Sequence, residues 1–548
     1  MVSHGPVTTH EVANQPPPLE NLDLYEHNRP LVEAVRRHDA AWAEDRLHAL
    51  GVEAGSAEVL KAGVDANENP PLLRTHDRFG RRIDEVEFHP AWHRLLGLAI
   101  AHGVHALPWR ENRTGSHVAR AAMMITLSQA ESGVGCPVSM TYAAFPALKA
   151  APALLDEWAP RLTSLDYDPR LVDPAEKRGA LCGMAMTEKQ GGSDVRANTT
   201  RATRVGDGKY ELVGHKWFCS APMSDAFLVL AQAEGGPSCF LLPRVLPGGE
   251  RNAFRIQRLK HKLGNRSNAS SEVEFHNARA FLVGDEGNGV RTIITMVNHT
   301  RLDCVLGSAA LLRYGVAHAT HHAAHRAAFG RTLAEQPLMQ NVLADLCVES
   351  EAATLTAIRL ARAFDAPASD EREAAFKRLA TAVAKYWICK IGPFHTAEAL
   401  EVLGGNGYVE DWPMARAYRE APLNSIWEGS GNVNALDVLR AIAREPHTLE
   451  AFLAEVEEAR GTDARLDSYV EGLKGEFTDL ADAELRARRV VERMAIALEG
   501  SLVMRFGDAA VADAFCAGRV AGGSGRAFGT LPPGLDFKGI IERHRPGV

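Results

Sequence analysis

The sequence predicts a multidomain protein in which a small antiparallel β domain lies between two helical regions and a further helical segment follows. Three observations support this fold class. At 548 residues the chain exceeds the size at which one hydrophobic core keeps growing. Apolar residues recur at helical spacing over long stretches on both sides of the middle region. The middle region itself consists of short β-rich runs separated by Gly, Asp and Pro.

The first predicted unit, residues 1–179, is mainly helical. Its apolar residues recur mostly at helical spacing, as Ala91, Leu95 and Leu98 do. The stretch 67–89 interrupts this pattern with prolines, a glycine and many charges, so we expect it to form a surface excursion.

Three further units follow along the chain. Residues 180–288 are predicted to form a β-barrel-like domain, because their runs are rich in β-branched and aromatic residues. Residues 289–444 return to long helical patterns with few breakers, which indicates a four-helix bundle. Residues 445–548 are predicted to be an appended helical domain, with a Gly/Pro-rich tail at 518–534.

The composition is that of an ordinary globular protein. It is 46% hydrophobic and 24% charged, and its net charge of -8 excludes a global basic field that would attract nucleic acid. The eight cysteines are scattered without a C-x-x-C pair, which favours reduced residues in a cytoplasmic protein. No apolar stretch has the length of a signal peptide core or of a membrane span.

Two glycine-rich segments far apart in the chain have the same character. Residues 186–195 read Met-Thr-Glu-Lys-Gln-Gly-Gly-Ser-Asp-Val, and residues 426–434 read Ile-Trp-Glu-Gly-Ser-Gly-Asn-Val-Asn. Each places hydroxyl and amide groups beside glycines, where backbone N–H groups can approach an anion or a cofactor ring closely. We interpret them as two parts of one cofactor site. The alternative for the first segment is a simple turn between strands, which is commoner.

The order of these motifs along the chain resembles the acyl-CoA dehydrogenase family over about residues 90–445. Four smaller motifs strengthen the resemblance: Lys-Trp-Phe-Cys-Ser at 216–220, Lys-Leu-Gly-Asn-Arg-Ser at 262–267, Arg-Ala-Ala-Phe-Gly at 326–330 and Gly-Gly-Asn-Gly-Tyr at 404–408. The resemblance implies a helical N-terminal domain, a β middle domain and a helical bundle. It also implies an FAD held between domains and subunits of a homotetramer.

The resemblance assigns cofactor roles to particular residues. The implied contacts are Met186, Thr187, Gly192, Ser193, Phe218, Cys219, Ser220, Arg326, Gln340, Gly404, Gly405, Ile426, Trp427, Ser430 and Asn432. Arg326 would pair with phosphate of a neighbouring subunit's cofactor, since a planar fork suits that anion. Plain strand core is the alternative for Phe218 and Cys219, a solvated arginine for Arg326, and a helix C-terminus for the glycines at 404 and 405.

Glu428 is the residue that the resemblance implies as the catalytic base, removing the α-proton of an acyl thioester. An apolar setting after Ile426 and Trp427 would raise its pKa toward working pH. A carboxylate at a helix start, stabilised by the helix dipole, is the alternative. Arg440 lies three helical turns later and could sit at the mouth of the pocket, or in a surface salt bridge. Glu401 stands where typical members of the family carry glutamine.

Several strings resemble the AidB branch of the family, including Asn-Gln-Pro-Pro-Pro-Leu at 14–19 and Lys-Leu-Gly-Asn-Arg-Ser-Asn-Ala-Ser at 262–270. That branch implies binding of double-stranded DNA, a role in the response to DNA alkylation, and weak isovaleryl-CoA-like dehydrogenase activity. Two other functions stay open: an ordinary catabolic acyl-CoA dehydrogenase, and a non-catalytic DNA-coating protein that the flavin only stabilises. We expect no metal site, although four histidines between 318 and 325 share one predicted helix.

Charge is strongly partitioned within the appended segment. Residues 445–484 hold 12 acidic and 3 basic residues, a net of -9, whereas 485–548 hold 6 and 10, a net of +4. A solvated helix face with a flexible tail is as good an explanation of this pattern as DNA contact. The candidate DNA contacts are Arg486, Arg489, Arg493, Arg519 and Arg526.

Overall fold

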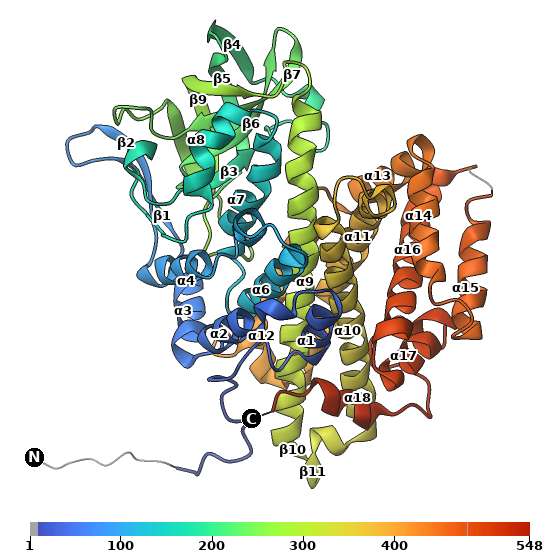
Figure 1. Cartoon of the computed structure of the whole chain (residues 1–548). Helices are drawn as coiled ribbons and strands as arrows, with labels where there is room; N and C mark the ends of the chain where they lie inside the picture. Colours follow the sequence, from blue (N-terminus) through green and yellow to red (C-terminus); the bar gives the residue numbers. More distant parts are fainter. Residues whose placement is uncertain (1–8, 479–480, 548) are drawn as a thin grey trace, which may run out of the picture.

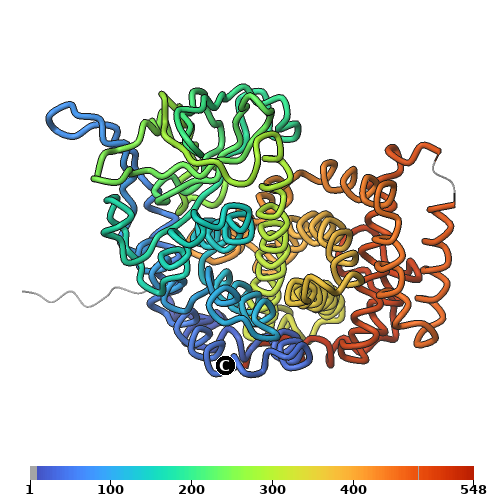
Figure 2. Tube along the Cα trace, turned by 45° about the horizontal axis from the view of Figure 1, so that its top comes forward, coloured from blue at the N-terminus to red at the C-terminus, as the bar shows by residue number. Residues whose placement is uncertain are grey.

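The computed structural model describes residues 9–478 and 481–547. Figure 1 shows the β domain around one end of a long central helix, α9 (Gly289–His325), with the N-terminal helices beside the same helix. The C-terminal helices lie on the far side of the bundle, and Figure 2 shows them well separated from the β domain. This order of helical, β, helical and appended helical regions confirms the predicted fold class.

The N-terminal helices are α1 (Arg29–Arg37), α2 (Glu44–Ala54), α3 (Ala57–Glu68), α4 (Pro90–Ala101), α5 (Leu107–Arg110), α6 (Ser116–Ala130), α7 (Gly135–Leu148) and α8 (Pro152–Leu162). Helices α1 to α6 pack into one core with the bundle, whereas α7 and α8 pack mainly into a second core with the β domain. Every residue of α6 is buried, because this helix lies between α2 and the two long helices of the bundle that it contacts.

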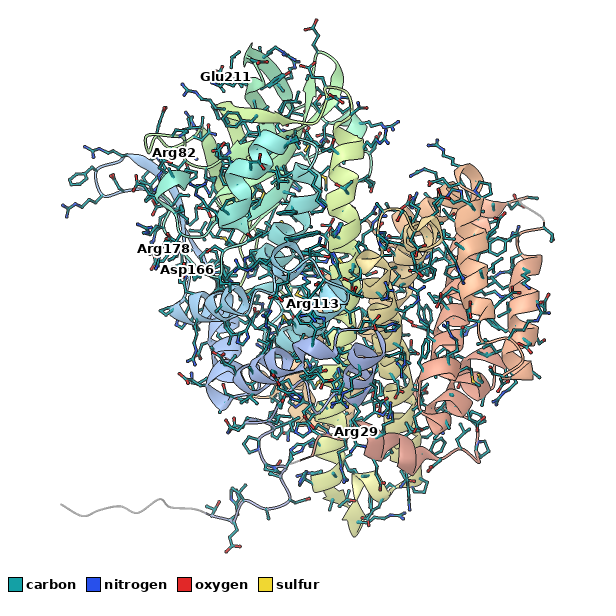
Figure 3. The ribbon with its side chains drawn as sticks, viewed as in Figure 1. Arg29, Arg82, Arg113, Asp166, Arg178 and Glu211 are labelled. Atoms are coloured by element: carbon teal, nitrogen blue, oxygen red, sulfur yellow. The ribbon has the colours of Figure 1, made fainter. Side chains whose placement is uncertain are left out.

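The stretch 67–89 is more ordered than the prediction of a loop implies. It contains a hairpin of β1 (Leu72–His76) and β2 (Arg82–Glu87), which project as an arm in Figure 1. The arm is fixed to the β domain: Arg82, labelled in Figure 3, donates from Nη2 to the carbonyl of Ile256 at 2.9 Å. In return, Ile256 N donates to Asp84 at 3.0 Å.

The β domain is a seven-stranded sheet with the order β3-β6-β4-β5-β9-β7, and β8 pairs with β9. A further pairing of β6 with β7 closes the sheet into a ring. Two pairings differ from the antiparallel prediction, because β3 and β4 each run parallel to β6. The strands are β3 (Cys182–Ala185), β4 (Arg201–Gly206), β5 (Lys209–Ser220), β6 (Ala226–Ala233), β7 (Gly236–Pro243), β8 (Phe254–Leu259) and β9 (Ser270–Val283).

Four helices form the bundle: α9, α10 (Pro337–Asp365), α11 (Glu371–Val402) and α13 (Gly431–Arg444). A small hairpin of β10 (Ala327–Ala328) and β11 (Arg331–Thr332) turns the chain between α9 and α10. The short helix α12 (Pro413–Glu420) follows α11 and packs back on α9. At about 1.5 Å per residue, the 37 residues of α9 span about 55 Å. This helix therefore connects two distant parts of the molecule.

The appended helices form a second layer on the bundle. They are α14 (His447–Glu457), α15 (Ala464–Gly475), α16 (Ala483–Phe506), α17 (Ala509–Phe515) and α18 (Phe537–His544). α16 packs on α10, α11 and α13, and buries Met494, Leu498 and Leu502. The segment 518–534 is not a free tail, since Gly529 N donates to Asp345 on α10 at 2.8 Å.

Ionisable groups are buried where α16 meets the bundle. Glu499 is 1% exposed, and neither of its carboxyl oxygens has a hydrogen-bond partner among the described residues. Burial raises its pKa well above the usual value of 4.5, and the neighbouring Glu349 raises it further. Burial also raises the pKa of Glu349, although Arg519 acts against this. The two carboxyl groups therefore raise each other's pKa across the contact between α10 and α16.

Replacing Glu499 with glutamine is expected to stabilise the protein at alkaline pH. A carboxyl with a raised folded-state pKa binds its proton more tightly in the folded state, so its stabilising contribution is lost as pH rises through that pKa. Glutamine removes this loss. We expect Glu499→Gln to raise Tm by about 2–4 °C at pH 8 and to change it little at pH 4. Thermal unfolding over this pH range checks it, with exposed Glu484→Gln on the same helix as control. An equal shift at both pH values would contradict the account.

All eight cysteines are free and buried. In the described residues, none of the helices combines the length and apolar character needed to cross a bilayer.

Candidate functional site

Glu188 anchors the first glycine-rich loop, which follows β3. Its fully buried carboxylate accepts hydrogen bonds from Thr199 N at 2.7 Å and Thr200 N at 3.1 Å. Lys216 Nζ lies 3.0 Å from the same carboxylate and also donates to the Met186 carbonyl at 3.2 Å. Burial opposes ionisation, but Lys216 and the hydrogen bonds hold the pKa of Glu188 well below its usual range. Glu188 is therefore a structural anchor.

This anchor leaves Thr187 and Ser193 together on the open side of the loop. The Thr187 carbonyl accepts from Trp217 N at 2.9 Å, which ties the loop to β5. A Cβ at Gly192 would lie 2.4 Å from Thr187 Oγ1, so only glycine allows this close approach. Thr187 is partly exposed and Ser193 is exposed, as a cofactor contact requires.

The three predicted cofactor contacts at the end of β5 do not lie on the same face of the strand. Phe218 is 54% exposed and offers an aromatic face beside Lys260, whose Nζ lies 4.5 Å from the ring centroid. Ser220 is partly buried. Cys219 is fully buried in the core of the β domain, so the prediction that its side chain lines the flavin is wrong. The strand places adjacent side chains on opposite faces.

Glu428 lies in a strained loop between the short turn Leu423–Ser425 and α13. Its φ is +57°, a conformation that costs energy for a residue with a side chain and that accumulates at functional sites. Buried cations on the neighbouring helices hold the loop. Arg301 Nε donates to the Glu428 carbonyl at 3.0 Å, and Lys385 Nζ donates to the Gly429 carbonyl. The Glu428 N–H donates to no protein acceptor in the described chain, which leaves it open to a ligand.

The Glu428 carboxyl is suited to proton transfer. Burial raises its pKa above the usual 4.5, while the Thr300 hydroxyl, Lys385 and Arg301 act in the opposite direction. Thr300 donates to Oε2 at 2.8 Å and so fixes the orientation of the carboxyl group. Asp303 on α9 adds a second carboxylate nearby and raises the pKa further. The result is an oriented carboxylate with an upward-shifted pKa.

Cys136 marks the place where the predicted parts of the site meet. Burial raises the pKa of its thiol, the Glu428 carboxylate raises it further, and the Ser220 hydroxyl lowers it. Met186 and Trp427 pack against the same apolar cluster that contains Cys136. The structure therefore brings the loop after β3, the end of β5 and the Glu428 loop together, although these segments lie far apart in the sequence. Ile426 stays 63% exposed at the edge.

The residues that follow Glu428 lie at the start of α13. Ser430 is the N-cap, but its side chain makes no capping hydrogen bond, and the side chain of Asn432 is exposed. Both are free to contact a ligand at this helix N-terminus, where a negative charge is favoured. Arg440 lies outside the site: it is 57% exposed and its nearest acid, Asp437, is 3.7 Å away. The alternative of a surface salt bridge describes Arg440 better than a position at the pocket mouth.

The other predicted cofactor contacts lie at the opposite end of α9. Arg326 follows the last turn of that helix and donates to the Asn14 carbonyl at 2.7 Å. Gln340, in the first turn of α10, donates to the Ala334 carbonyl at 2.9 Å. Gly404 adopts a φ of +61° in the loop after α11, and Gly405 beside it is exposed.

A single chain cannot bring the residues around Glu428 and the residues around Arg326 to the same ligand. Thr300, which contacts Glu428, and Arg326 are 26 residues apart on or next to α9, which corresponds to about 39 Å. In Figure 1 the small β10–β11 hairpin next to Arg326 lies at the bottom and the β domain at the top. The two halves of the predicted site are thus separated within a single copy.

The three predicted DNA contacts on α16, which are Arg486, Arg489 and Arg493, are not free charges. Arg489 and Arg493 both lie within 2.8 Å of Glu476, and Arg486 contacts the same carboxylate at 2.8 Å. Of the three, Arg489 is the most exposed, at 65%. Arg526 is exposed on the segment after α17.

Arg519 is placed where it cannot reach DNA. Its guanidinium is 15% exposed and pairs with the buried carboxylates of Asp345 at 2.5 Å and Glu349 at 3.2 Å. The prediction of a DNA contact at Arg519 is therefore wrong. It is a structural cation that joins the appended segment to α10, since a buried carboxylate requires a compensating charge.

Four residues around Glu428 were missed by the sequence reasoning. Thr300, Arg301 and Asp303 come from α9, and Lys385 comes from α11. No motif links them to Glu428, because the contacts bridge 128 residues for Thr300 and 44 residues between Lys385 and Gly429. The helical period of α9 alone would have placed residues 300 and 303 on one face.

Comparison with known families matches three successive parts of the chain. Residues 14–169 match the Adaptive response protein AidB N-terminal domain. Residues 183–278 match the Acyl-CoA dehydrogenase, middle domain, and residues 287–443 match the Acyl-CoA dehydrogenase, C-terminal domain. With this fold and this site, the chain belongs to the acyl-CoA dehydrogenase family, whose members are FAD-dependent oxidoreductases that act on CH–CH groups.

The relatives identify the branch. The chain is 48% identical to "Putative acyl-CoA dehydrogenase AidB" of Escherichia coli (strain K12) over 510 residues, covering 93% of this chain and 94% of that protein. It is 31% identical to Acyl-CoA dehydrogenase family member 11 of Caenorhabditis elegans, covering 76% and 70%. The crystal structure of Caenorhabditis elegans ACDH-11 in complex with C11-CoA is similar, with a TM-score of 0.86, 28% identity and coverage of 94% and 92%. Within the family, the chain belongs to the AidB branch.

Proposed function

We propose that this protein is an FAD-dependent acyl-CoA dehydrogenase in which Glu428 removes the α-proton of an acyl thioester. The observation that carries the proposal is the Glu428 carboxyl itself, which is oriented by Thr300 and has a raised pKa. Carboxylates tuned in this way are suited to general-base catalysis near neutral pH. FAD, when bound, supplies the acceptor for the hydride that leaves the β-carbon.

The residues on the open side of the site fit an aromatic dinucleotide. Phe218 offers an exposed aromatic face, and Thr187 and Ser193 offer hydroxyl groups beside glycines that permit close approach. The uncapped start of α13 at Ser430 offers amide donors to a pyrophosphate.

The chain's own groups support the proton transfer. The free N–H of Glu428 can donate to the thioester carbonyl, and this interaction would stabilise the enolate that forms when the α-proton leaves. Arg301 and Lys385 hold the carbonyls of Glu428 and Gly429, so the strained loop keeps the N–H and the carboxyl in place. Glu428 is only partly exposed, which limits the access of water to its carboxyl group.

We infer that the cofactor site is completed by a second copy of the chain. Arg326, Gln340, Gly404 and Gly405 lie about 39 Å along α9 from the Glu428 region, which is too far for one cofactor to reach both within one copy. Large apolar side chains around Arg326 are exposed, including Phe329 at 96% and Leu338 at 84%. A partner would cover such a surface. We therefore propose a homo-oligomer, with the homotetramer as its expected form.

We also propose that the protein binds double-stranded DNA without sequence preference and acts in the response to DNA alkylation. The match to the adaptive response AidB domain and the exposed arginines at 489 and 526 support this. Arg486 and Arg493 share Glu476 with Arg489, which reduces the charge they can offer. The free, buried cysteines support a cytoplasmic location.

Reversing the two exposed arginines is expected to weaken DNA binding. The double variant Arg489→Glu/Arg526→Glu should lower the affinity for a 30-base-pair duplex by about tenfold or more and flatten its salt dependence, since fewer counterions are released. Fluorescence anisotropy at several salt concentrations measures both effects.

A matched double reversal on the hairpin arm provides the control. Arg78→Glu/Arg81→Glu changes the net charge equally at exposed positions between β1 and β2. Equal loss in both double variants would show that only net charge matters. If the unaltered protein does not bind at 50 mM salt, the DNA proposal fails and a catabolic dehydrogenase becomes the better account.

A further inference from the structure

A large cavity lies apart from the Glu428 carboxyl, and the proposed function does not use it. Its volume is about 1150 Å³, which is at the upper limit of ordinary ligand pockets. It lies between α3, the chain after β8, the C-terminal third of α9 and the start of α12. Glu428, Thr300 and Thr187 are not among its lining residues. We call it the strap cavity.

The outer wall of the cavity is the N-terminal segment 14–19, which we call the proline strap. Three anchors fix it in place. Asn14 exchanges hydrogen bonds with the backbone of Ala327 at 2.7 and 2.9 Å. His321 Nε2 lies 2.8 Å from the Pro17 carbonyl, and Asn406 donates to Gln15 at 3.5 Å. Three successive prolines limit the strap's freedom, so it forms a preformed wall.

Part of the cavity wall is apolar. Leu60 on α3, Leu259 at the end of β8 and Ala317 on α9 line it, together with the ring of Trp412 and the prolines of the strap. This surface is suited to an aliphatic or aromatic body.

The polar part of the wall has an excess of hydrogen-bond donors. Asn268 is 1% exposed and lines the cavity. Neither its amide nitrogen nor its amide oxygen meets the geometry of a hydrogen bond to another described residue, although the amide faces the Cys136 thiol. In the described chain, Arg416 Nη1 and Arg419 Nε are likewise buried without a hydrogen-bond partner, although the Arg416 guanidinium lies near the Tyr314 hydroxyl and the Glu131 and Glu420 carboxylates. Such groups are costly unless a ligand or water satisfies them.

The balance of donors and acceptors indicates the chemistry of the ligand. The three nitrogens of Asn268, Arg416 and Arg419 can only donate, and two of them belong to guanidinium groups. The carboxylates that line the cavity lie at its exposed or partly exposed rim, where Asp65 pairs with Lys61 and Glu410 pairs with Arg419. A molecule that fits must therefore bring acceptors to the interior, and a negative charge is favoured there.

We propose that the strap cavity binds a small amphipathic carboxylate, with its apolar body against the strap, Leu60 and Trp412 and its carboxylate toward Asn268 and the two arginines. The Glu428 carboxyl does not line the cavity, although Asn268 lies beside the Cys136 thiol that borders the Glu428 region. The strap also joins the cavity to one predicted cofactor contact, because Arg326 donates to the Asn14 carbonyl. Asn406, which follows Gly404 and Gly405, donates to Gln15.

Calorimetric titration with decanoate tests the proposal on the flavin-loaded, full-length protein. We expect one decanoate to bind per chain, with decan-1-ol at least about tenfold weaker and decylamine weaker still. The carboxylate offers two charged acceptors to the guanidinium groups, the alcohol offers one neutral acceptor, and the ammonium offers none. The flavin absorption spectrum should stay unchanged, since the Glu428 region is not involved. A flavin shift, or equal binding of the alcohol and the acid, would overturn the proposal.

Two variants locate the binding. Ala317→Phe places a ring inside the cavity and should lower decanoate affinity at least about tenfold. Ala324→Phe, on the same helix but outside the cavity lining, should leave the affinity unchanged. Asn268→Leu removes the amide while keeping the side-chain volume, and it should also weaken decanoate binding. It serves as the test if Ala317→Phe does not fold. Unchanged decanoate affinity in the folded cavity variants would place the ligand elsewhere and contradict the inference.

Discussion

Glu428→Gln is expected to slow flavin reduction by an acyl-CoA about 10²- to 10⁴-fold, the usual contribution of a general base. Glutamine preserves the size of the side chain and the contact with Thr300 Oγ1, but it cannot accept the α-proton. Anaerobic stopped-flow measurement of flavin bleaching with a panel of acyl-CoAs gives the rate.

Glu420→Gln is the matched control. Glu420 is also a buried carboxyl, and burial raises its pKa to about 7, but it accepts from Asn265 N at 2.6 Å instead of lying at the flavin-facing loop. Flavin reduction in this variant should stay close to that of the unaltered protein. If Glu428→Gln reduces its flavin as fast as the control, Glu428 is not the base.

The rate should also depend on pH in a defined direction. The base must be ionised, and burial raises the pKa of Glu428 above 4.5. The rate of flavin reduction is therefore expected to fall as pH decreases through that raised pKa, and the acidic limb of the profile should disappear in Glu428→Gln.

Arg120→Met is expected to destabilise the protein by about 3–5 kcal/mol, because it leaves a buried carboxylate without its counterion. Arg120 on α6 is 1% exposed. It pairs with Asp303 on α9 through both terminal guanidinium nitrogens, with Nη2 at 2.8 Å. Its Nε donates to the Val104 carbonyl at 2.9 Å, and its guanidinium lies 3.8 Å from the Tyr142 ring centroid. Methionine keeps most of the packing but none of these polar contacts. Urea denaturation followed by tryptophan fluorescence measures the change.

Arg120→Met should also raise the pKa of the Glu428 carboxyl. Asp303 already raises the pKa of Glu428, so removing the counterion of Asp303 should move the pH profile of flavin reduction to higher pH. The double variant Arg120→Met/Asp303→Leu should recover part of the lost stability, because no unpaired charge remains. Arg94→Met, which breaks an exposed pair with Glu58, should leave the urea midpoint unchanged. Loss of stability no greater than in this control would refute the assigned role of the buried pair.

The sequence predicted the order of the domains because hydrophobic period is a local property. The change from helical spacing to short β-rich runs near residue 180 corresponds to the start of β3 at Cys182, and the return near 289 corresponds to the start of α9 at Gly289. The parallel pairing of β3 with β6 and the hairpin at 72–87 were missed. Strand direction is decided by tertiary pairing, which composition does not record.

The site was predictable where glycine and hydroxyl residues cluster in the sequence. It was not predictable where contacts between residues far apart in the sequence determine its geometry. The segments around Thr187 and Glu428 were recognised from local strings and lie around the same apolar cluster. Their support from Arg301 and Lys385 depends on how α9 and α11 pack, which no short motif encodes. Arg519 shows the converse: its charge suggested a surface, but the fold places it against buried Asp345. Charge in a sequence does not reveal the partner that neutralises it.

The central claim is that one cofactor site combines the Glu428 region of one copy with the Arg326 region of another. Co-expression of Glu428→Gln chains with Arg326→Glu chains tests it most directly, because each variant damages a different half. If the site spans two copies, random pairing restores about a quarter of the sites, and flavin reduction by acyl-CoA reappears although each variant alone is inactive. Mixed oligomers whose flavin reduction does not exceed that of the separate variants would contradict the account.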